Sequence, residues 1–260
     1  MNRKTSIILG IGVCAALALA ISCATIDRVV VVPPMIAGAK YVGMDACAAC
    51  HEKTVKNFKH TLHARMQIVA DEKRVPGQGC EGCHGPGSLH VDAGGGKGKF
   101  IVNPGKNPEA CFQCHIDKQA EFSLPSHHPV KEGRMSCNSC HDPHGENIFR
   151  TKSLSITRAN DVCAQCHRSQ TRPHVFAHEA VREGCQNCHQ VHGSINPKML
   201  TERDNTLCLK CHVTLSSPKK IMIGGINAED HVSRMRNGSC FSAGCHTAVH
   251  GSNFNNHLRY

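Results

Sequence analysis

The stretch Cys47-Ala48-Ala49-Cys50-His51 is the first of eight copies of one short pattern in this chain. Two cysteines with a histidine directly after the second form the attachment signature of c-type haem. In such a site the two thiols bond to the haem vinyl groups, and the histidine binds the iron as its proximal axial ligand. The stretch therefore predicts a covalently bound haem.

The other copies repeat these three side chains and differ in the residues between them. They are Cys80, Cys83 and His84; Cys111, Cys114 and His115; Cys137, Cys140 and His141; Cys163, Cys166 and His167; Cys185, Cys188 and His189; Cys208, Cys211 and His212; and Cys240, Cys245 and His246. The last copy is wider, with four residues between its cysteines. Zinc sites, redox dithiols and disulfides also use paired cysteines, but none of them requires a histidine after every pair. We therefore expect eight c-type haems and no catalytic residues.

Large apolar side chains are scarce in the 260 residues, with no Trp, two Tyr and eight Phe. These are too few for an ordinary hydrophobic core in a chain of this length. The sequence therefore predicts a multihaem cytochrome c fold. We expect mostly coil with short α-helices wrapped around an extended haem array, and little or no β-structure.

The N-terminus has the features of a secretory signal peptide. Two basic residues precede a small, apolar stretch over 6–22, and charged residues follow it, which favours a cleaved signal over a transmembrane anchor. The run Ala20-Ile21-Ser22-Cys23 resembles a bacterial lipobox with Cys23 as the lipidated residue; cleavage after Ala20 or Ala24 is the alternative. We expect a signal peptide over 1–22, an N-terminal tether over 23–40 and an octahaem domain over 41–260.

The formal net charge of +10 suggests an anionic partner at first sight. Cleavage of 1–22 removes Arg3 and Lys4, and eight haems bring two propionates each. The charge of the holoprotein is then about −8, so nucleic acid is not an expected partner.

The second half of the chain repeats itself. His127-His128-Pro129-Val130 precedes the fourth motif as His178-Glu179-Ala180-Val181 precedes the sixth. Aligning the two valines pairs His127 with His178, and leaves His128 as the alternative to His127. A His-Gly pair follows each of these motifs, and a degenerate third copy surrounds the last one. The pattern predicts an array that lengthens by pairs of haems.

The second axial position of each iron needs a further histidine. The candidates are those that recur at matching places around the motifs: His63, His90, His127, His144, His178, His192, His231 and His250. This selection leaves His60, His128, His174 and His257 unassigned. His141 and His144 are too close in sequence to bind one iron from opposite sides, and so are His189 and His192. We therefore expect His144 and His192 to bind the irons of neighbouring haems.

Two regions allow a local prediction. Apolar residues at helical spacing predict a helix over 52–70, with His63 beside its apolar face. The Gly- and Pro-rich residues 85–110 predict a loop without regular structure.

Two imidazoles on each iron leave no position for a substrate, which favours an electron carrier over an enzyme. The segments CEGCHGPGSLHV (80–91), HHPVKEGRMSCNSCHDPHG (127–145) and HEAVREGCQNCHQVHGS (178–194) resemble multihaem cytochromes of the DmsE/MtrA type. The chain resembles an octahaem version of that family, and His144, His178 and His192 match its distal-ligand pattern.

The resemblance implies a periplasmic subunit of an outer-membrane porin–cytochrome conduit for extracellular electron transfer. Its expected partners are a β-barrel porin, an outer-surface multihaem cytochrome and periplasmic electron donors. One alternative is a soluble or polymerising periplasmic or extracellular carrier. Another is a reductase of nitrite, hydroxylamine or a sulfur oxyanion, which needs an iron with a free axial position.

Overall fold

The structure is a computed structural model, which describes residues 34–65, 69–70, 73–74, 79–145, 156–217, 220–223, 231, 235, 238–242 and 245–260. Pro33–Tyr260 form one compact unit. The predicted signal peptide, Cys23 and the tether up to residue 33 lie outside the described residues. In the part of the chain that the structure describes, no helix is both long enough and apolar enough to cross a membrane.

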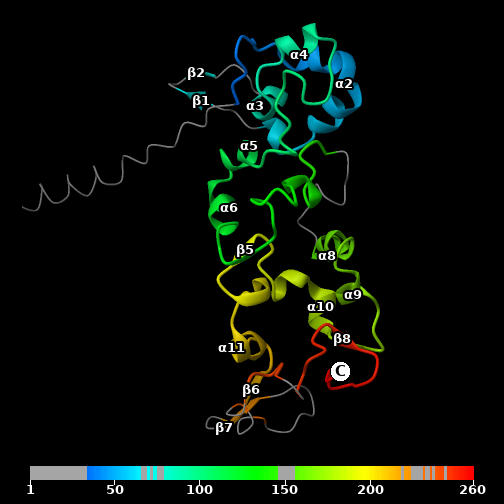
Figure 1. Cartoon of the computed structure of the whole chain (residues 1–260). Coiled ribbons are helices and arrows are strands. Elements are labelled where there is room, and N and C mark those ends of the chain that lie inside the picture. Colours follow the sequence, from blue (N-terminus) through cyan, green and yellow to red (C-terminus); the bar gives the residue numbers. More distant parts are fainter. Residues whose placement is uncertain are drawn as a thin grey trace, which may run out of the picture. The chain divides into compact units, whose positions relative to one another are not determined.

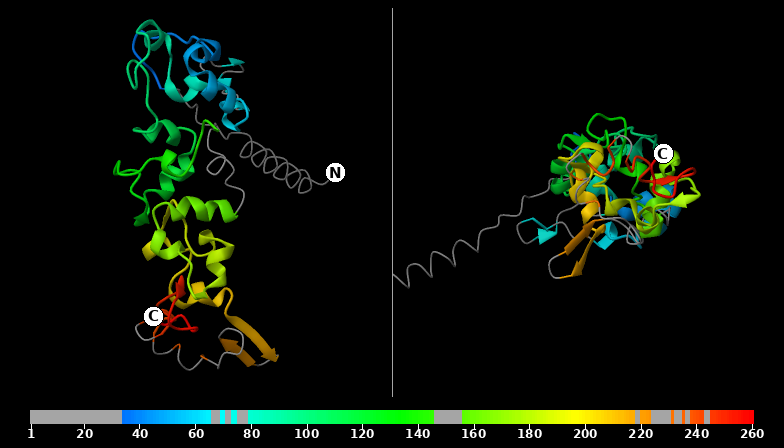
Figure 2. Two further views of the ribbon diagram at one scale, coloured as in Figure 1. Left: turned by 90° about the vertical axis from the view of Figure 1, so that its right-hand side faces the viewer. Right: turned by 90° about the horizontal axis from the view of Figure 1, so that it is seen from below.

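Short helices joined by long irregular segments make up most of the fold, as Figures 1 and 2 show. The α-helices are α2 (Met44–Phe58), α3 (Cys80–His84), α4 (Ser88–Asp92), α5 (Glu109–Phe112), α6 (Ile116–Glu121), α8 (Ile156–Ala164), α9 (Arg168–Thr171), α10 (Glu179–Glu183) and α11 (Asp204–Leu209). The 3-10 turns are η1 (His63–Arg65), η2 (Cys137–Ser139), η3 (Cys185–Asn187) and η4 (Pro197–Met199). The prediction of coil with short helices is confirmed.

The strands are short and pair in twos, all antiparallel. They are β1 (Val69–Ala70), β2 (Lys73–Arg74), β3 (Ser126–His127), β4 (Phe176–Ala177), β5 (Gly193–Ser194), β6 (Val213–Ser217), β7 (Lys220–Ile223) and β8 (Gly251–Ser252). Strands β1 and β2 pair locally, and so do β6 and β7. The other two pairs, β3 with β5 and β4 with β8, join segments far apart in the sequence. One joins the segment before the fourth motif to the segment after the sixth, and the other joins the segment before the sixth motif to the segment after the eighth.

Buried apolar side chains in the described part of the chain form only small groups. Phe112, Phe122 and Val130 are buried together, and Met135 and Cys137 pack against them. This agrees with the scarcity of large apolar residues in the sequence. Such a cluster is too small to stabilise a chain of this size by itself.

Helix α2 ends at Phe58, so the prediction of a helix as far as residue 70 was wrong. Val55 and Phe58 are buried as the spacing predicts, but Leu62 is 81% exposed. The Thr61 hydroxyl donates to the Phe58 carbonyl oxygen at 2.8 Å and accepts the Ala64 N–H at 3.2 Å. A hydroxyl that bonds the backbone in this way competes with helical hydrogen bonds. The chain therefore turns at Thr61 and continues into η1, which begins at His63.

Helix α4 lies inside the segment predicted to be a loop, so that prediction was wrong for Ser88–Asp92. These five residues contain neither Gly nor Pro. Gly87 precedes the helix, and the chain leaves it at Ala93 and Gly94. The glycines therefore bound this helix rather than prevent it.

A buried carboxylate ties the N-terminal part of the compact unit to the second motif. Glu81, between Cys80 and Cys83, is 2% exposed. Its Oε1 accepts the N–H groups of Val42 and Gly87, and its Oε2 accepts that of Gly43, all at 2.9 Å. Hydrogen bonds to an ionised acceptor are stronger than neutral ones, so this contact fixes α2 beside α3.

Candidate haem-binding sites

The motifs share one local backbone conformation. The histidine N–H donates to the carbonyl oxygen of the first cysteine at 2.9–3.0 Å in five of them: His115 to Cys111, His141 to Cys137, His167 to Cys163, His189 to Cys185 and His212 to Cys208. This is the bond of one α-helical turn. It brings the two thiols and the imidazole of a motif together.

The chain leaves the helix at the motif histidine itself. His51 has φ −114° and ψ 39°, His115 has −101° and 55°, and His167 has −91° and 50°. Helices α6 and α9 then begin directly after their histidines. The motif turn and the following helix therefore differ in direction, with the ligand at the corner.

The wide last motif closes in the same way as the others. The His246 N–H donates to the Cys240 carbonyl oxygen at 2.9 Å, although two more residues lie between them. This supports the assignment of Cys240, Cys245 and His246 as a haem motif.

The sixteen motif cysteines are all free thiols, so the structure gives no support to the disulfide alternative. The first cysteines of successive motifs contact one another in pairs: Cys47 with Cys80, Cys111 with Cys137, Cys163 with Cys185, and Cys208 with Cys240. The hydrogen bond between Cys111 and Cys137 lowers the pKa of Cys137 to about 7 and raises that of Cys111.

The cysteine contacts above group the motifs into four pairs, and each pair lies next to the following one. Cys83 interacts with Cys114, Cys140 with Cys163, and Cys188 with Cys211. Each of these contacts joins an even-numbered motif to the odd-numbered motif after it. The motifs are therefore neighbours in space in the order in which they follow one another in the chain.

Two asparagines at matching places in the repeat hold these pairs of motifs together. Asn160, three residues before Cys163, accepts the Cys185 N–H at 3.0 Å and donates to the Val181 carbonyl oxygen at 3.0 Å. Asn205, three residues before Cys208, accepts the Cys240 N–H at 2.7 Å. Asn107 instead accepts the N–H of Glu109, within its own turn. The asparagines of the repeat thus join the fifth motif to the sixth and the seventh to the eighth.

Seven motif histidines face a second histidine ring. The ring centroids are 6.0–6.3 Å apart in the pairs His84–His144, His115–His63, His141–His192, His167–His128, His189–His250, His212–His178 and His246–His231. Within a pair the two residues belong to different segments of the chain. Each ring pair is therefore a contact between two separate segments of the chain.

The spacing of the rings fits an iron between them. A first-row metal binds an imidazole nitrogen at about 2.0 Å, and that nitrogen lies about 1.1 Å from the ring centre. Two rings on opposite sides of one ion therefore have centres roughly 6.2 Å apart. The seven observed distances agree with that value, so the residues present fit a haem iron with two axial histidines.

The hydrogen bonds of the rings leave the other nitrogen for iron. The Nδ1 atoms of five of these histidines lie next to backbone carbonyl oxygens: His84 with Val102, His128 with Val191, His178 with Val249, His189 with Lys198, and His246 with His257. Such a bond fixes the tautomer and the orientation of a metal-binding imidazole. In each case Nε2 is the atom left for the metal.

Burial favours the neutral form of several rings. It lowers the pKa of His63, His84, His141 and His250 below the usual value for histidine. Neighbouring histidines lower the pKa of these four further. Neutral imidazole is the form that binds a metal.

The structure places His128, and not the predicted His127, in a ring pair. His127 uses both nitrogens elsewhere: Nδ1 lies near the Leu124 carbonyl oxygen, and Nε2 is 2.8 Å from Oε1 of Glu132. The bond to Glu132 is the main cause of a raised pKa of His127. Ladder β3–β5 places His127 opposite Gly193, just as ladder β4–β8 places Ala177 opposite Gly251. His128 is therefore the equivalent of His178, and the alignment of the valines was one residue off.

Two predicted ligands, His51 and His90, are not among the seven ring pairs. The Nδ1 of His90 lies 2.9 Å from the Lys99 carbonyl oxygen, as in five of the paired histidines. Of the histidines left unassigned by the sequence, His60 and His257 are exposed. Both ring nitrogens of His174 are buried without a hydrogen-bond partner in the described part of the chain.

The glycine after a distal histidine lets two segments approach closely. A β-carbon on Gly193 would overlap the Glu121 carbonyl oxygen, and one on Gly145 would lie 3.1 Å from the Asn57 carbonyl oxygen. On Gly251 it would lie 2.7 Å from the His174 ring. The His-Gly pattern in the sequence thus reflects a histidine held where the chain passes directly against another segment.

Comparisons with known proteins agree with this geometry. The family model for the doubled CXXCH motif matches residues 127–172 and 178–216. Multiheme cytochrome MtrA of Shewanella baltica is 27% identical, over 81% of this chain and 79% of its own length. Cytochrome c-type protein NrfB of Haemophilus influenzae is 27% identical, over 59% of this chain and 72% of its own length. Dissimilatory sulfite reductase MccA of Wolinella succinogenes is 23% identical over 64% of this chain, but over only 27% of its own length.

A protein with repeated haem motifs and paired imidazoles on a mostly irregular chain is a multihaem c-type cytochrome, and its activity is electron transfer. The similarity to MtrA extends over most of both sequences. The chain is therefore a multihaem c-type cytochrome that resembles MtrA.

Proposed function

We propose that the chain binds eight c-type haems, each with two axial histidines, and conducts electrons along them. The observation that carries this proposal is the set of seven ring pairs with centroids 6.0–6.3 Å apart. Haem iron supplies a reversible one-electron couple. An iron bound on both sides by imidazole has no site for a substrate, which suits electron transfer better than catalysis.

The proposed proximal ligands are the eight motif histidines. The proposed distal ligands are His63, His128, His144, His178, His192, His231 and His250 for the seven ring pairs, with His90 for the remaining iron, that of His51. His128 replaces His127 in this set. The sixteen motif cysteines hold the eight haems covalently.

His90 is assigned by elimination. It is the distal candidate that remains after the seven ring pairs of the described residues, and His51 is the motif histidine that remains. The Nδ1 of His90 lies 2.9 Å from the Lys99 carbonyl oxygen, as in five of the paired histidines, so its Nε2 is left for a metal.

The contacts between motifs support conduction along the chain. Cysteines of each motif contact or approach those of the next, from Cys47 and Cys80 to Cys208 and Cys240. Because a haem is bonded to these sulfurs, neighbouring motifs hold neighbouring haems. The ring pairs tighten this arrangement, since most of them join segments that belong to different motifs.

We further propose that the protein is the periplasmic subunit of an outer-membrane porin–cytochrome conduit. The similarity to MtrA over most of the chain supports this role. Its partners are then a β-barrel porin, an outer-surface multihaem cytochrome and periplasmic electron donors. Copurification of the holoprotein with a porin is the expected result, and a protein isolated free of membrane partners under mild extraction would favour a soluble or polymerising carrier.

The second candidate is a multihaem reductase, since MccA carries that name. It requires an iron with a free axial position. Low-temperature EPR of the fully oxidised protein, with spin quantitation per haem, separates the two. We expect low-spin iron only and a mass that corresponds to eight attached haems; one high-spin iron in the native protein would favour the reductase.

The same measurement tests the choice of ligand between adjacent histidines. His128→Ala is expected to convert one iron to high spin, because its Nδ1 is held by Val191 and its ring faces His167 at 6.1 Å. His127→Ala is the matched control and is expected to leave the spin count unchanged. The reverse result would restore His127 as the ligand.

A further inference from the structure

His192 differs from the carbonyl-bonded histidines in the partner of its Nδ1. That atom lies 2.9 Å from Oε2 of Glu121, a carboxylate at the end of helix α6. Its ring faces His141 with centroids 6.1 Å apart. His192 therefore combines a place opposite a motif histidine with a direct hydrogen bond to an anion.

Neighbouring groups hold this contact in place. The Phe122 ring, which is 7% exposed, packs against the His192 ring with centroids 5.3 Å apart. The adjacent Gly193 lies against the Glu121 backbone, where a β-carbon would not fit. The imidazole and the carboxylate are thus fixed by packing from both of their segments.

A second charge acts on the same carboxylate. The Lys118 ammonium lies 2.7 Å from Oε1 of Glu121 and 3.0 Å from the Asp117 carboxylate. Partial burial raises the pKa of Glu121, but the hydrogen bonds from Lys118 and His192 outweigh it and lower the pKa overall. Glu121 is therefore ionised, and Lys118 offsets part of its charge.

We propose that Glu121 makes the haem of the fourth motif a site of low reduction potential in the middle of the array, and that Lys118 limits this effect. The proposal rests on the proposed function, in which His141 and His192 bind one iron. An anionic acceptor on Nδ1–H makes Nε2 a stronger donor to the iron than a carbonyl acceptor does. The ferric state is then stabilised relative to the ferrous state, and hydrogen bonding around the ligands is one of the means by which proteins set such potentials.

His141 and His192 would hold the iron of this haem, which would supply a one-electron couple that exchanges electrons with the haems of the neighbouring motifs. The role of the chain's own residues is to keep the Nδ1 proton between His192 and Glu121 in both oxidation states. A low potential at this position would make reduction of the central site the uphill step of transfer in either direction.

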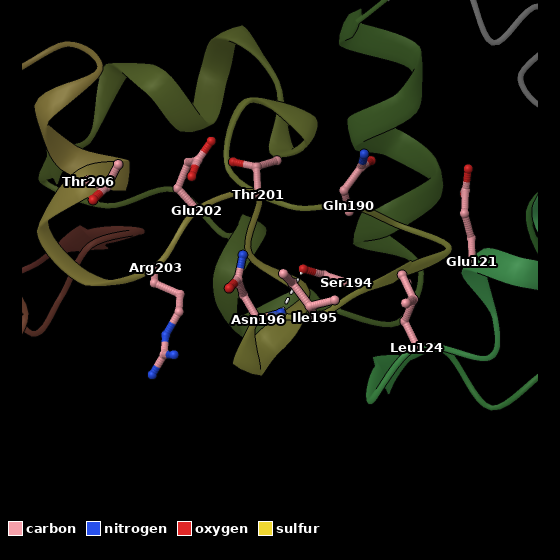
Figure 3. Close-up of a pocket in the computed structure, with 11 residues that line it drawn as sticks. Glu121, Leu124, Gln190, Ser194, Ile195, Asn196, Thr201, Glu202, Arg203 and Thr206 are labelled. Atoms are coloured by element: carbon pink, nitrogen blue, oxygen red, sulfur yellow. Dashed lines mark hydrogen bonds between the residues drawn. The ribbon is translucent and has the colours of Figure 1, made fainter.

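The Glu121 carboxylate is accessible to solvent through a cavity. Glu121 lines this cavity of about 500 Å³ with Leu124 and with residues that follow the sixth motif, among them Gln190 and Ser194. Figure 3 shows Glu121 and Leu124 at one side of this cavity and Glu202, Arg203 and Thr206 at the other. The Glu121 side chain is about one third exposed, so water screens its charge in part, and the hydrogen bond rather than distant Coulomb attraction carries most of the effect.

Spectroelectrochemistry of the holoprotein tests the proposal with two opposed substitutions. Glu121→Gln keeps the size of the side chain and removes its charge. We expect the reduction equilibrium of one haem to become about tenfold more favourable, a shift of about 59 mV. Lys118→Gln is expected to shift the same haem in the opposite direction. A purely structural disturbance does not predict opposite signs.

Glu132→Gln is the matched control, because Glu132 makes the same kind of bond to His127, which faces no motif histidine. It is expected to leave every potential close to that of the native protein. EPR accompanies each variant: low-spin iron throughout in Glu121→Gln, with altered g-values for one haem, supports tuning. A high-spin iron in that variant overturns it, because Glu121 then merely holds the ligand.

Two other results overturn the proposal: unchanged potentials in Glu121→Gln, or shifts of the same sign in the Glu121 and Lys118 variants. His192→Ala identifies a failure of the underlying ligation separately. It must produce one high-spin iron if His192 binds iron at all, whatever the role of Glu121.

Discussion

Replacing Gly193 with alanine is expected to release His192 from the iron of the fourth motif. A β-carbon at this position would overlap the Glu121 carbonyl oxygen and lie 2.8 Å from the carbonyl carbon. Both are backbone atoms, so strand β5 must move away from the end of α6, and His192 moves with it. The strain also lowers the free energy of unfolding by about 3 kcal/mol. EPR with spin quantitation should then detect one high-spin iron that the native protein lacks.

Gly105→Ala is the control for this substitution. A β-carbon there would meet only the ends of two side chains, Asn103 at 3.2 Å and Asn138 at 3.4 Å. These ends can shift without backbone movement, so the spin count should stay native. A native spectrum for Gly193→Ala would show instead that the His-Gly pattern does not depend on close approach of the two segments.

Replacing Glu81 with alanine is expected to detach the N-terminal part of the compact unit from the second motif. Three N–H groups, those of Val42, Gly43 and Gly87, lose an anionic acceptor at once, and that of Gly87 is buried. A hydrogen bond to a charged group contributes about 1.5–3 kcal/mol, less where solvent reaches it, so we expect a loss of about 3 kcal/mol in the free energy of unfolding. Faster amide hydrogen exchange at these three residues, measured by NMR or mass spectrometry, should accompany that loss.

Glu109→Ala tests whether any loss of a carboxylate has this effect. Glu109 is exposed and its side chain makes only a long contact of 3.4 Å with Gln119. Its removal should leave both the unfolding free energy and the exchange of the three amides nearly unchanged. Native protection of Val42, Gly43 and Gly87 in Glu81→Ala would contradict the role assigned to this carboxylate.

The local features of this protein follow from its sequence. The motif spacing alone indicates c-type haem, because a single helical turn is enough to bring two thiols and one imidazole together. The scarcity of aromatic residues likewise predicts short helices and small apolar clusters. Two local predictions from the sequence failed. Helix α2 ends at Phe58 because the Thr61 hydroxyl bonds the backbone there. Helix α4 forms because the glycines stand before and after it and not within it.

The pairing of histidines was decided by the tertiary structure. His189 and His250 are far apart in the chain, and what brings them together is ladder β4–β8 and the close approach at Gly251. The sequence signal for His128 was present, since it stands beside His127, but the valine alignment pointed to the wrong one. Ladder β3–β5 separates the two histidines, because it pairs His127 with Gly193, while His128, the residue after the strand, is held by the Val191 carbonyl oxygen.

The contact between Glu121 and His192 had no sequence signal at all, because the two residues are 71 positions apart and Glu121 lies before the repeat that contains His192. The sequence by itself therefore indicated c-type haem and the class of fold, and it predicted the proximal ligands, because these features depend on residues within one turn of each other. The tertiary structure decided which distant histidine faces each of seven motif histidines and which carboxylate lies against His192. The reason is that those contacts depend on backbone register between segments that only the folded chain brings together.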